Sequence, residues 1–335
     1  MDSEVKAIVS KAMNGGLLSE REIRALFSVK DFSPESAYIQ WAARSFSSAL
    51  MKGKAEVHGQ LGIDTGQCPK NCQFCSFAAS NKAFPESSRD SVEKIVQNVV
   101  ALERAGANAI YVMATATYSF DDYLAVAERI VNERTTKLPL IANIGDFNER
   151  QAQELKDVGF SGVYHAIRLG EGTVTRIPVE RRWKTIEAVH AAGLVLGTCV
   201  EPVGPEHSID ELIEKTVFTR EMNAVFSGAM RRTLIPSSPL ASYGQVSYAH
   251  MALIVAVVAL ATGVGVPGNC THEPNPLGVA HGANLVWAEV GSNPRDTEAE
   301  TVRGWTVSRC RELYQECGWD VLEGPSVLFD GPASA

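Results

Sequence analysis

Short apolar runs alternate with amphipathic helical segments along most of this 335-residue chain, and this alternation limits the possible folds more than any other feature. The candidate strands are Glu56–Ile63, Ala109–Ala114, Leu138–Ile144, Gly162–Ile167, Val195–Val200, Met230–Ile235, Val264–Gly268 and Asn284–Ala288. The segments between them, such as SVEKIVQNVVALERAG and VERRWKTIEAVHAAG, space their apolar residues for one helical face, often with Gly just beyond the end. Strands that alternate with helices predict a parallel sheet covered by helices.

The number of candidate strands favours a closed α/β barrel over an open sheet. Eight candidates with nearly regular spacing, and no glycine-rich phosphate fingerprint, predict a (β/α)8 TIM-type barrel. We expect an N-terminal helical extension over residues 1–50, the barrel over residues 51–320, and a tail over residues 321–335 whose last part, GPSVLFDGPASA, frays. Functional residues would then lie where the strands end, at the carboxyl face of the barrel.

The charge balance and the apolar segments argue against several classes of function. A net charge of -8 is unlike that of a protein that grips a phosphate backbone, and it suits small neutral or zwitterionic substrates better. The N-terminus, MDSEVKAIVSKAMNGG, lacks the apolar core of a secretory signal. The longest apolar stretch, Met251–Val266, is short for a membrane span and contains two glycines, so it predicts a buried helix. We expect a cytoplasmic protein that binds neither membranes nor nucleic acid.

Three of the seven cysteines lie within eight residues, directly after the first candidate strand. Cys68, Cys72 and Cys75 form a C-x3-C-x2-C pattern in the segment IDTGQCPKNCQFCSFAAS. Three thiolates at this spacing can bind three irons of a 4Fe-4S cubane and leave the fourth iron open to an external ligand. The alternative is a structural zinc ion, but zinc prefers a fourth protein ligand and no further Cys or His follows nearby.

The cysteine motif resembles that of the radical S-adenosylmethionine (SAM) superfamily. In that family, the open iron binds the amino and carboxylate groups of SAM, and reduction of the cluster yields methionine and a 5'-deoxyadenosyl radical. The resemblance also places Phe74, just before the third cysteine, against the adenine. It implies a 4Fe-4S cluster and SAM as cofactors, a small-molecule substrate, and an electron donor such as ferredoxin or flavodoxin.

The resemblance extends over about residues 10–320 and is greatest to the biotin synthase-like branch. That branch includes biotin synthase, the hydrogenase maturase HydE, methylornithine synthase, the HmdB proteins and two-protein lipoyl synthases. The segments that carry it are ERQAQELKDVGFSGVYHAIRLGEGT, VERRWKTIEAVHAAGLVLGTCVEPVGPEHS, RRTLIPSSPLAS and HGANLVWAEVGSNPRD. It implies the radical SAM fold, here as a complete (β/α)8 barrel with an enclosed active site.

By position, Arg168 and Arg182 resemble residues that bind the SAM carboxylate, and Glu171 one that lies near the ribose or the amino group. A guanidinium suits a planar carboxylate, which agrees with this assignment. Arg181 is an alternative to Arg182, and a surface salt bridge is the other interpretation of each arginine.

Two departures from the family pattern concern the second strand and the substrate. The usual glycine- and glutamate-containing SAM motif is replaced by MATATYS, in which Thr115 or Thr117 would contact the SAM amino group. Biotin synthase binds a sacrificial 2Fe-2S cluster with strand cysteines, and the matching positions here are Val112, Ile141 and Thr198. Biotin synthesis is therefore not expected.

Three polar residues are candidates for contact with a substrate. Glu201 shares a strand face with Cys199 and is expected in the barrel lumen, since a carboxylate is costly against the apolar helix layer. Asn143 is expected on a lumen face, and His272 in the loop GVPGNCTHEPN after the seventh strand. The alternatives are a buried structural ion pair for Glu201 and a helix cap or solvated turn for His272.

Two further pairs are ambiguous in the sequence alone. Arg231 and Arg232 are predicted to end a helix and open a strand, where one would bind a substrate carboxylate. Cys310 and Cys317 lie on one face of a predicted helix and would either help to bind a second iron-sulfur cluster or be a structural pair. Cys199 and Cys270 are predicted to lie too far away to complete a second cluster site.

The sequence favours a radical SAM enzyme that makes a cofactor or an unusual amino acid by rearrangement or fragmentation of a substrate radical. The first alternative is sulfur insertion of the lipoyl synthase type, with a partner protein. An alternative of another class is a noncatalytic iron-sulfur carrier, which would need an exposed cluster.

Overall fold

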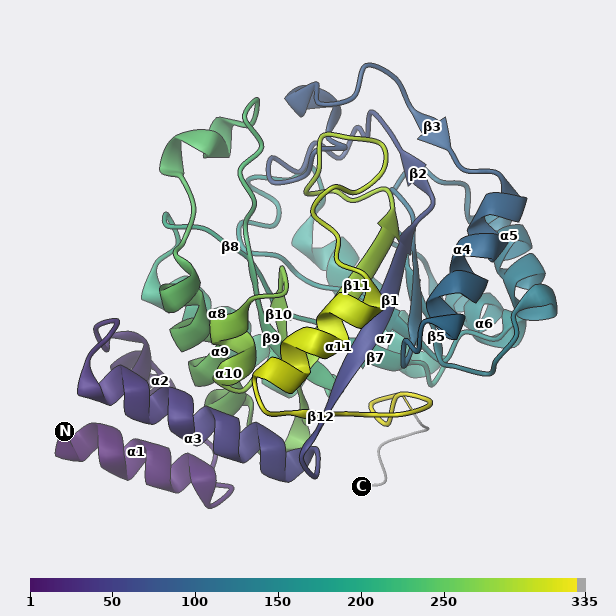
Figure 1. Ribbon diagram of the computed structural model, residues 1–335. Coiled ribbons are helices and arrows are strands. Elements are labelled where there is room, and N and C mark those ends of the chain that lie inside the picture. The colour runs from purple at the N-terminus through teal and green to yellow at the C-terminus, as the bar shows by residue number, and fades with distance from the viewer. Residues whose placement is uncertain (330–335) are drawn as a thin grey trace.

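The computed structural model describes residues 1–329 and consists of an N-terminal group of helices beside a barrel of parallel strands (Figure 1). The N-terminal helices are α1 (Ser3–Met13), α2 (Glu20–Phe27) and α3 (Pro34–Leu50). The barrel strands are β1 (Lys54–Gly62), β4 (Ile110–Met113), β5 (Leu140–Asn143), β6 (Gly162–Tyr164), β7 (Val195–Gly197), β8 (Val200–Val203), β9 (Phe226–Arg231), β10 (Gly268–His272) and β11 (Leu285–Gly291). The barrel helices are α4 (Val92–Arg104), α5 (Phe120–Glu133), α6 (Glu149–Val158), α7 (Val179–Ala191), α8 (Ile209–Glu221), α9 (Tyr248–Thr262), α10 (Pro276–Ala280) and α11 (Val307–Glu316). Short strands β2 (Asp64–Thr65) and β3 (Ser88–Arg89) pair with each other above the barrel, and β12 (Asp320–Val321) pairs with β1.

The strands form one curled parallel sheet in the order β7-β6-β5-β4-β1-β11-β10-β9-β8. Strands β7 and β8 are separated only by Thr198 and Cys199, so they occupy one position between β6 and β9. The Val225 amide donates to the Leu196 carbonyl at 2.9 Å, which joins the two ends of the sheet. The predicted (β/α)8 TIM-type barrel is therefore confirmed.

Helices begin where the sequence offers a capping side chain and cover the barrel with their apolar faces. Ser91, Ser119 and Ser208 each accept a hydrogen bond from a first-turn amide, at the starts of α4, α5 and α8. Their buried residues, for example Ile95 and Val99 of α4, pack in the layer between helices and strands. The amphipathic spacing in the sequence thus corresponds to this layer.

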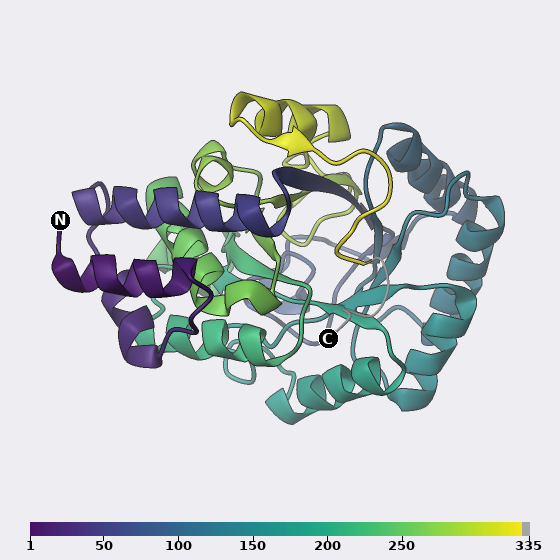
Figure 2. The same ribbon diagram turned by 90° about the horizontal axis from the view of Figure 1, so that it is seen from below.

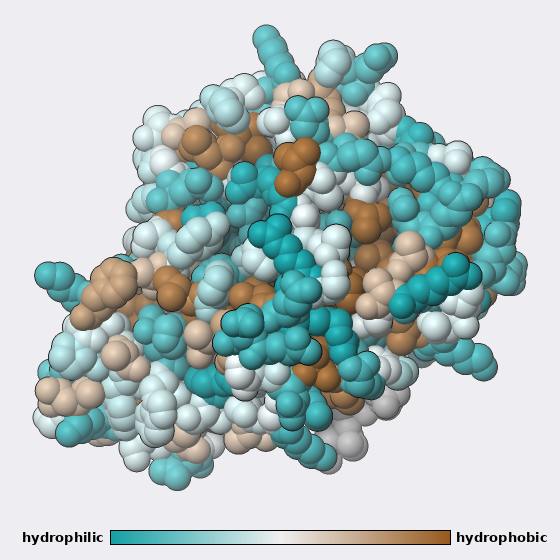
Figure 3. All heavy atoms as spheres, viewed as in Figure 1, coloured by the Kyte–Doolittle hydropathy of each residue, from teal (hydrophilic) through white to brown (hydrophobic). Residues whose placement is uncertain are grey.

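Helix α9 is the exception, because it is apolar on all sides. It lies between β9 and β10 on one side and α3 on the other (Figure 2). Its residues from Met251 to Thr262 are buried. Its length and composition alone would suit a membrane span, but most of it is buried inside the protein, as in the core helix of a globular domain. On the face seen in Figure 3, hydrophobic residues form small separate patches among hydrophilic ones.

Two predicted strands are misplaced along the chain. The strand predicted over 230–235 is found at Phe226–Arg231, and the one predicted over 264–268 is found at Gly268–His272. Both observed strands contain polar residues, such as Ser227 in β9 and Asn269 in β10, so they do not form the continuous apolar runs that the prediction followed. Arg231 is therefore the last residue of a strand and Arg232 follows it, so neither opens a strand. His272 is likewise the last residue of a strand instead of a loop residue.

The C-terminal segment closes the lower end of the barrel, so the prediction that it frays is wrong as far as residue 329. After β12, the amide of Val327 donates to Glu56 Oε1 at 2.9 Å, and Leu328 and Phe329 are buried in the lumen. Glu56 also lies 2.6 Å from His58 Nε2, in the interior. The rest of the predicted tail, residues 330–335, lies outside the described residues. A functional site is therefore expected at the opposite end of the barrel, where the strands have their carboxyl ends.

Candidate active site

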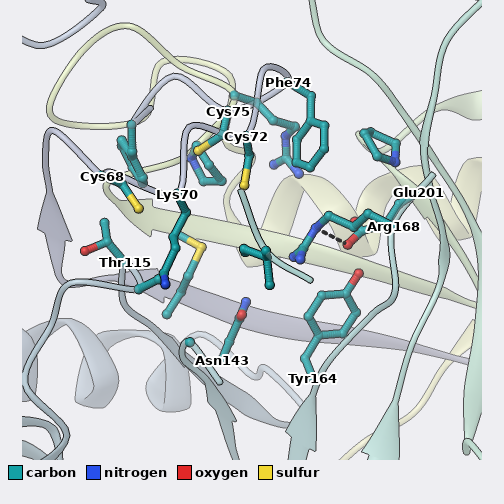
Figure 4. Close-up of a pocket in the computed structure, with 18 of the residues that line it drawn as sticks. Cys68, Lys70, Cys72, Phe74, Cys75, Thr115, Asn143, Tyr164, Arg168 and Glu201 are labelled. Atoms are coloured by element: carbon teal, nitrogen blue, oxygen red, sulfur yellow. Dashed lines mark ion pairs between the residues drawn. The ribbon is translucent and has the colours of Figure 1, made fainter. Parts of the chain in front are cut away.

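A cavity lies at the carboxyl ends of the barrel strands (Figure 4). Most strand positions supply part of its wall: Met113 from the end of β4 and Thr115 after it, Asn143 from β5, Tyr164 and Arg168 from β6 and its loop, Glu201 from β8, Met230 and Arg231 from β9, and Arg295 after β11. The cysteine loop covers it from above. The site thus lies at the face of the barrel where the fold predicts one.

Cys68, Cys72 and Cys75 line the same cavity. Backbone bonds shape their loop: the Cys68 amide donates to the Phe77 carbonyl at 2.7 Å, and the Cys75 amide to the Cys72 carbonyl at 2.9 Å. Asn71 adopts a left-handed φ of 48° between the first two cysteines, and its side-chain oxygen accepts from the Ser80 amide at 2.9 Å. These hydrogen bonds fix the conformation of the loop in which all three cysteines line the cavity.

The three thiols suit a multinuclear cluster better than a single ion. Over residues 1–329, no three His, Cys, Asp or Glu side chains converge as the ligands of one metal ion would. Burial raises the pKa of Cys72 to about 11 and that of Cys75 to about 12, so both are thiols until a metal displaces the proton. Three thiolates, each on its own iron, are the donor set of a cubane with one open corner.

Arg168 and Glu201 form an ion pair at the cavity wall, with Arg168 Nε and Glu201 Oε1 3.1 Å apart (Figure 4). Burial lowers the pKa of Arg168, and the charges of Glu201 and Glu171 more than offset this effect. The pair lies beside Phe74, whose ring is 6.0 Å from the Arg168 guanidinium. The hydroxyl of Tyr164 lines the same wall and is buried, with no hydrogen-bond partner among the described residues.

Arg182 belongs to a buried ion network at the edge of the cavity. Its NH1 lies 3.1 Å from Asp146 Oδ1, and its Nε lies 3.3 Å from Glu171 Oε2. Glu171 also accepts from the Arg168 amide at 3.2 Å and from the Thr175 hydroxyl at 2.6 Å. The structure therefore places Glu171 behind the cavity wall, where it positions both arginines.

The two threonines of the second-strand motif differ in position. Thr115 lines the cavity, and its amide and hydroxyl both donate to Asp64, at 2.8 and 2.6 Å. Thr117 is exposed outside the lining and contacts the Thr115 hydroxyl at 2.8 Å. The sequence analysis missed Asp64, although an acid directly after the first strand is a signal that could have identified it.

His272 lies behind Arg295 instead of on the cavity wall. Both of its ring nitrogens are within 3.0 Å of the Arg295 guanidinium, and its ring stacks on Trp287 at 5.2 Å. Glu289 Oε1 lies 3.1 Å from His272 Nε2 and 2.5 Å from Arg295. The structure thus brings Asn143 and Glu201 to the cavity but not His272, and Arg295 occupies the wall in its place.

Lys70 is a cavity residue that the sequence analysis missed, although a basic residue inside a metal-binding loop is a recognisable signal. Its side chain points into the cavity from the cysteine loop (Figure 4). The arginines that line the cavity are each paired with an acid: Arg168 with Glu201, Arg182 with Asp146 and Glu171, Arg231 with Glu273, Arg232 with Glu206, and Arg295 with Glu289. Within the described part of the chain, Lys70 alone among these lining cations has no acid partner within 4.0 Å.

Comparison with known families identifies the chain. Residues 63–218 match the model of the Radical SAM superfamily, a region that includes the cysteine loop, Arg168, Arg182 and Glu201. The chain therefore contains a radical SAM domain, and its curated relatives support the biotin synthase-like branch of that superfamily. This radical SAM protein is 24% identical to the biotin synthase of Carboxydothermus hydrogenoformans over 234 residues, which cover 67% of this chain and 70% of that protein. Seven other curated biotin synthases match over 43–64% of their own lengths.

Solved structures agree on the fold of this radical SAM enzyme. Methylornithine synthase (PylB) superimposes with a TM-score of 0.79 at 16% identity, covering 96% of this chain and 98% of that one. HydG, a maturase of the [FeFe]-hydrogenase, also gives 0.79 at 16% identity, covering 95% of this chain and 76% of that one. The family implies a 4Fe-4S cluster and SAM, and the donor set at the cysteine loop fits the cluster.

A second cluster site is not apparent in the described residues of this radical SAM enzyme. Cys310 lies 3.6 Å from the Trp287 carbonyl and Cys317 lies 3.7 Å from the Pro276 carbonyl, so each thiol has a separate backbone neighbour. The other two cysteines contact each other, with Cys199 Sγ and Cys270 Sγ 2.7 Å apart.

Proposed function

We propose that this enzyme cleaves SAM reductively and uses the resulting 5'-deoxyadenosyl radical to take a hydrogen atom from a small substrate, which then rearranges or fragments. The product would be a cofactor precursor or an unusual amino acid. One observation carries this proposal: the three loop cysteines, the Arg168–Glu201 pair and Asn143 face one cavity inside a barrel. The bound cluster would supply the electron, and every other task falls to side chains of the cavity.

These side chains divide into a polar wall and an apolar wall. Arg168, Glu201 and the unpartnered Tyr164 hydroxyl form a polar wall that can orient a substrate by hydrogen bonds. Met113 and Ile144 line the cavity with apolar groups that exclude water from a reactive intermediate. Burial first, and then the charges of Arg182 and Arg168, lower the pKa of His165 well below its ordinary value, so this lining histidine is neutral and offers a substrate hydrogen-bonding groups without adding charge.

Sulfur insertion with a partner protein is the less favoured version of this function. It needs a sulfur donor such as a second cluster, which typically has at least three cysteine ligands. Cys199 and Cys270 form a pair without a third thiol, and Cys310 and Cys317 have separate backbone neighbours. Rearrangement or fragmentation needs only the groups that already line the cavity.

Anaerobic incubation of the reconstituted enzyme with dithionite and SAM tests the proposal. We expect 5'-deoxyadenosine and methionine in equal amounts by liquid chromatography, and about four irons and four sulfides per chain. A protein that binds the cluster but forms no 5'-deoxyadenosine would be a carrier, and the proposal would be wrong. Clearly more than four irons and sulfides would favour sulfur insertion.

We further propose that Lys70 binds the carboxylate of SAM. An unpaired ammonium in a cavity attracts an anion, and a charge-assisted hydrogen bond contributes about 1.5–3 kcal/mol. The Lys70→Met variant should therefore bind SAM roughly 10- to 100-fold more weakly in equilibrium dialysis without substrate. Its affinity for decarboxylated SAM should equal that of the wild type.

The matched control is Lys137→Met, an exposed lysine at the opposite end of the barrel that should leave both affinities unchanged. Equal losses for SAM and decarboxylated SAM would point to a general charge effect. Unchanged SAM affinity would remove Lys70 from the SAM site. Either result contradicts the assignment.

A further inference from the structure

Two buried thiols meet inside the barrel below the cavity. Cys199 and Cys270 are 2% and 0% exposed, and their sulfurs lie 2.7 Å apart. A small movement separates this contact from a disulfide, whose sulfurs are about 2.05 Å apart. Burial first, and the neighbouring Cys270 next, raise the pKa of Cys199 well above its ordinary value, so the reduced pair is a dithiol at neutral pH.

The fold brings these sulfurs together across an intervening strand. Cys199 directly precedes β8 and Cys270 is the central residue of β10, while β9 runs between them. Opposite Cys270 in β9 is Gly228, with a φ of +104°. A Cβ at Gly228 would lie 2.2 Å from the Cys270 carbonyl oxygen, so only glycine allows this approach.

The pair lies one layer of side chains below the cavity floor. Cys199 and Cys270 pack in one buried cluster with Tyr164 and Met230, and both of these residues also line the cavity. A small oxidant that enters the cavity therefore meets the dithiol after a single layer. Two residues further along each strand lie Glu201 and His272, so the pair connects the strand segments that carry them.

We propose that Cys199 and Cys270 form an internal disulfide on prolonged exposure to hydrogen peroxide, and that this bond holds the barrel together in the oxidised enzyme. The reaction is slow because both sulfurs are buried. One thiol reacts with hydrogen peroxide to give a sulfenic acid and one water. The second thiol then displaces the hydroxyl group as a second water and forms the S–S bond. Two thiol hydrogens and the peroxide thus become two waters. The bond closes a long loop between positions 71 residues apart, which restricts the unfolded chain.

Peptide mapping of the peroxide-treated holoenzyme tests the disulfide. The protein is unfolded in the presence of N-ethylmaleimide, digested and analysed by mass spectrometry. We expect a linked Cys199–Cys270 peptide that has lost two hydrogens and that disappears after phosphine treatment, whereas anaerobic protein gives two alkylated thiols. Cys310 and Cys317 serve as an internal comparison and should be alkylated in both samples. Separate, alkylated Cys199 and Cys270 after peroxide treatment would overturn the proposal.

Thermal unfolding tests the stabilising role. After the cluster has been removed, the linked wild type should unfold about 5 °C higher than the same protein with the disulfide reduced. The Cys270→Ser variant should show no such difference. Equal unfolding temperatures for linked and reduced wild type would overturn the stabilising role, and the peptide map remains decisive even where the variant does not fold. Neither the peptide map nor the unfolding temperature depends on SAM cleavage. A protein that forms no 5'-deoxyadenosine would therefore contradict the proposed function without affecting the test of the disulfide.

Discussion

The Cys72→Ala variant is expected to fold normally but to lose the cluster, and its formation of 5'-deoxyadenosine should fall on the order of a thousandfold or more. Cys72 is the central cysteine of the motif and lines the cavity together with Cys68 and Cys75. Alanine would remove one of the three proposed iron ligands, and two thiolates cannot retain a cubane that also needs an open corner. The measurements are iron content, the brown absorbance of the anaerobic protein, and product formation with dithionite and SAM.

A matched control comes from the same chain. Cys317 is half-buried directly after α11, its thiol lies 3.7 Å from the Pro276 carbonyl, and it does not line the cavity, so Cys317→Ala should retain iron and activity within twofold of the wild type. Thermal unfolding of both variants would separate loss of the cluster from loss of the fold. Cluster assembly and SAM cleavage at the wild-type rate in Cys72→Ala would be incompatible with the proposed function.

The fold was predictable from the sequence because each element has its own local pattern. The cysteine motif is likewise local, with three ligands within eight residues. The prediction went wrong at β9 and β10, where the strands contain Ser227, Asn269 and Thr271 and one residue has a positive φ. Ser227 and Asn269 lie next to the lumen residues Phe226 and Cys270, so their side chains face the helix layer. There Ser227 donates to the Thr219 hydroxyl and Asn269 to the Val255 carbonyl, and a search for apolar runs cannot detect a strand whose polar side chains are hydrogen-bonded in this way.

The composition of the site was less predictable, because it depends on which charges pair. Glu201 and Arg168 are 33 positions apart, and nothing in their local sequence indicates that they neutralise each other. The same limit applies to Lys70: its place in the cysteine loop is visible in the sequence, but only the fold shows that it lines the cavity without an acid partner among the described residues. His272 was predicted as a site residue on its position after a strand, but Arg295, from a distant loop, covers it.

Arg182 is where the resemblance and the structure suggest different roles. The resemblance makes it a SAM carboxylate ligand, yet its guanidinium already lies between Asp146 and Glu171, and all three side chains are at most 6% exposed. Removing one partner of a buried ion pair lowers the free energy of unfolding by far more than the intact pair adds to it, because the remaining charge is then uncompensated. We therefore expect Arg182 to be required mainly for stability.

The Arg182→Met variant should lose about 3–5 kcal/mol of stability and move the midpoint of urea unfolding down by roughly 1 M or more. Arg181→Met is the matched control: Arg181 also approaches Asp146, at 3.4 Å, but its side chain is 57% exposed, and we expect a loss of less than about 1 kcal/mol. Equilibrium dialysis with SAM on both variants completes the test. If Arg182→Met unfolds like the wild type but binds SAM at least 30-fold more weakly, Arg182 is a SAM ligand. The protein then needs Arg182 for SAM binding and not for the stability of the buried network. If the midpoint falls while the SAM affinity stays within threefold of the wild type, Arg182 belongs to the buried network. The carboxylate of SAM is then expected to bind Lys70, which has no acid partner among the described residues.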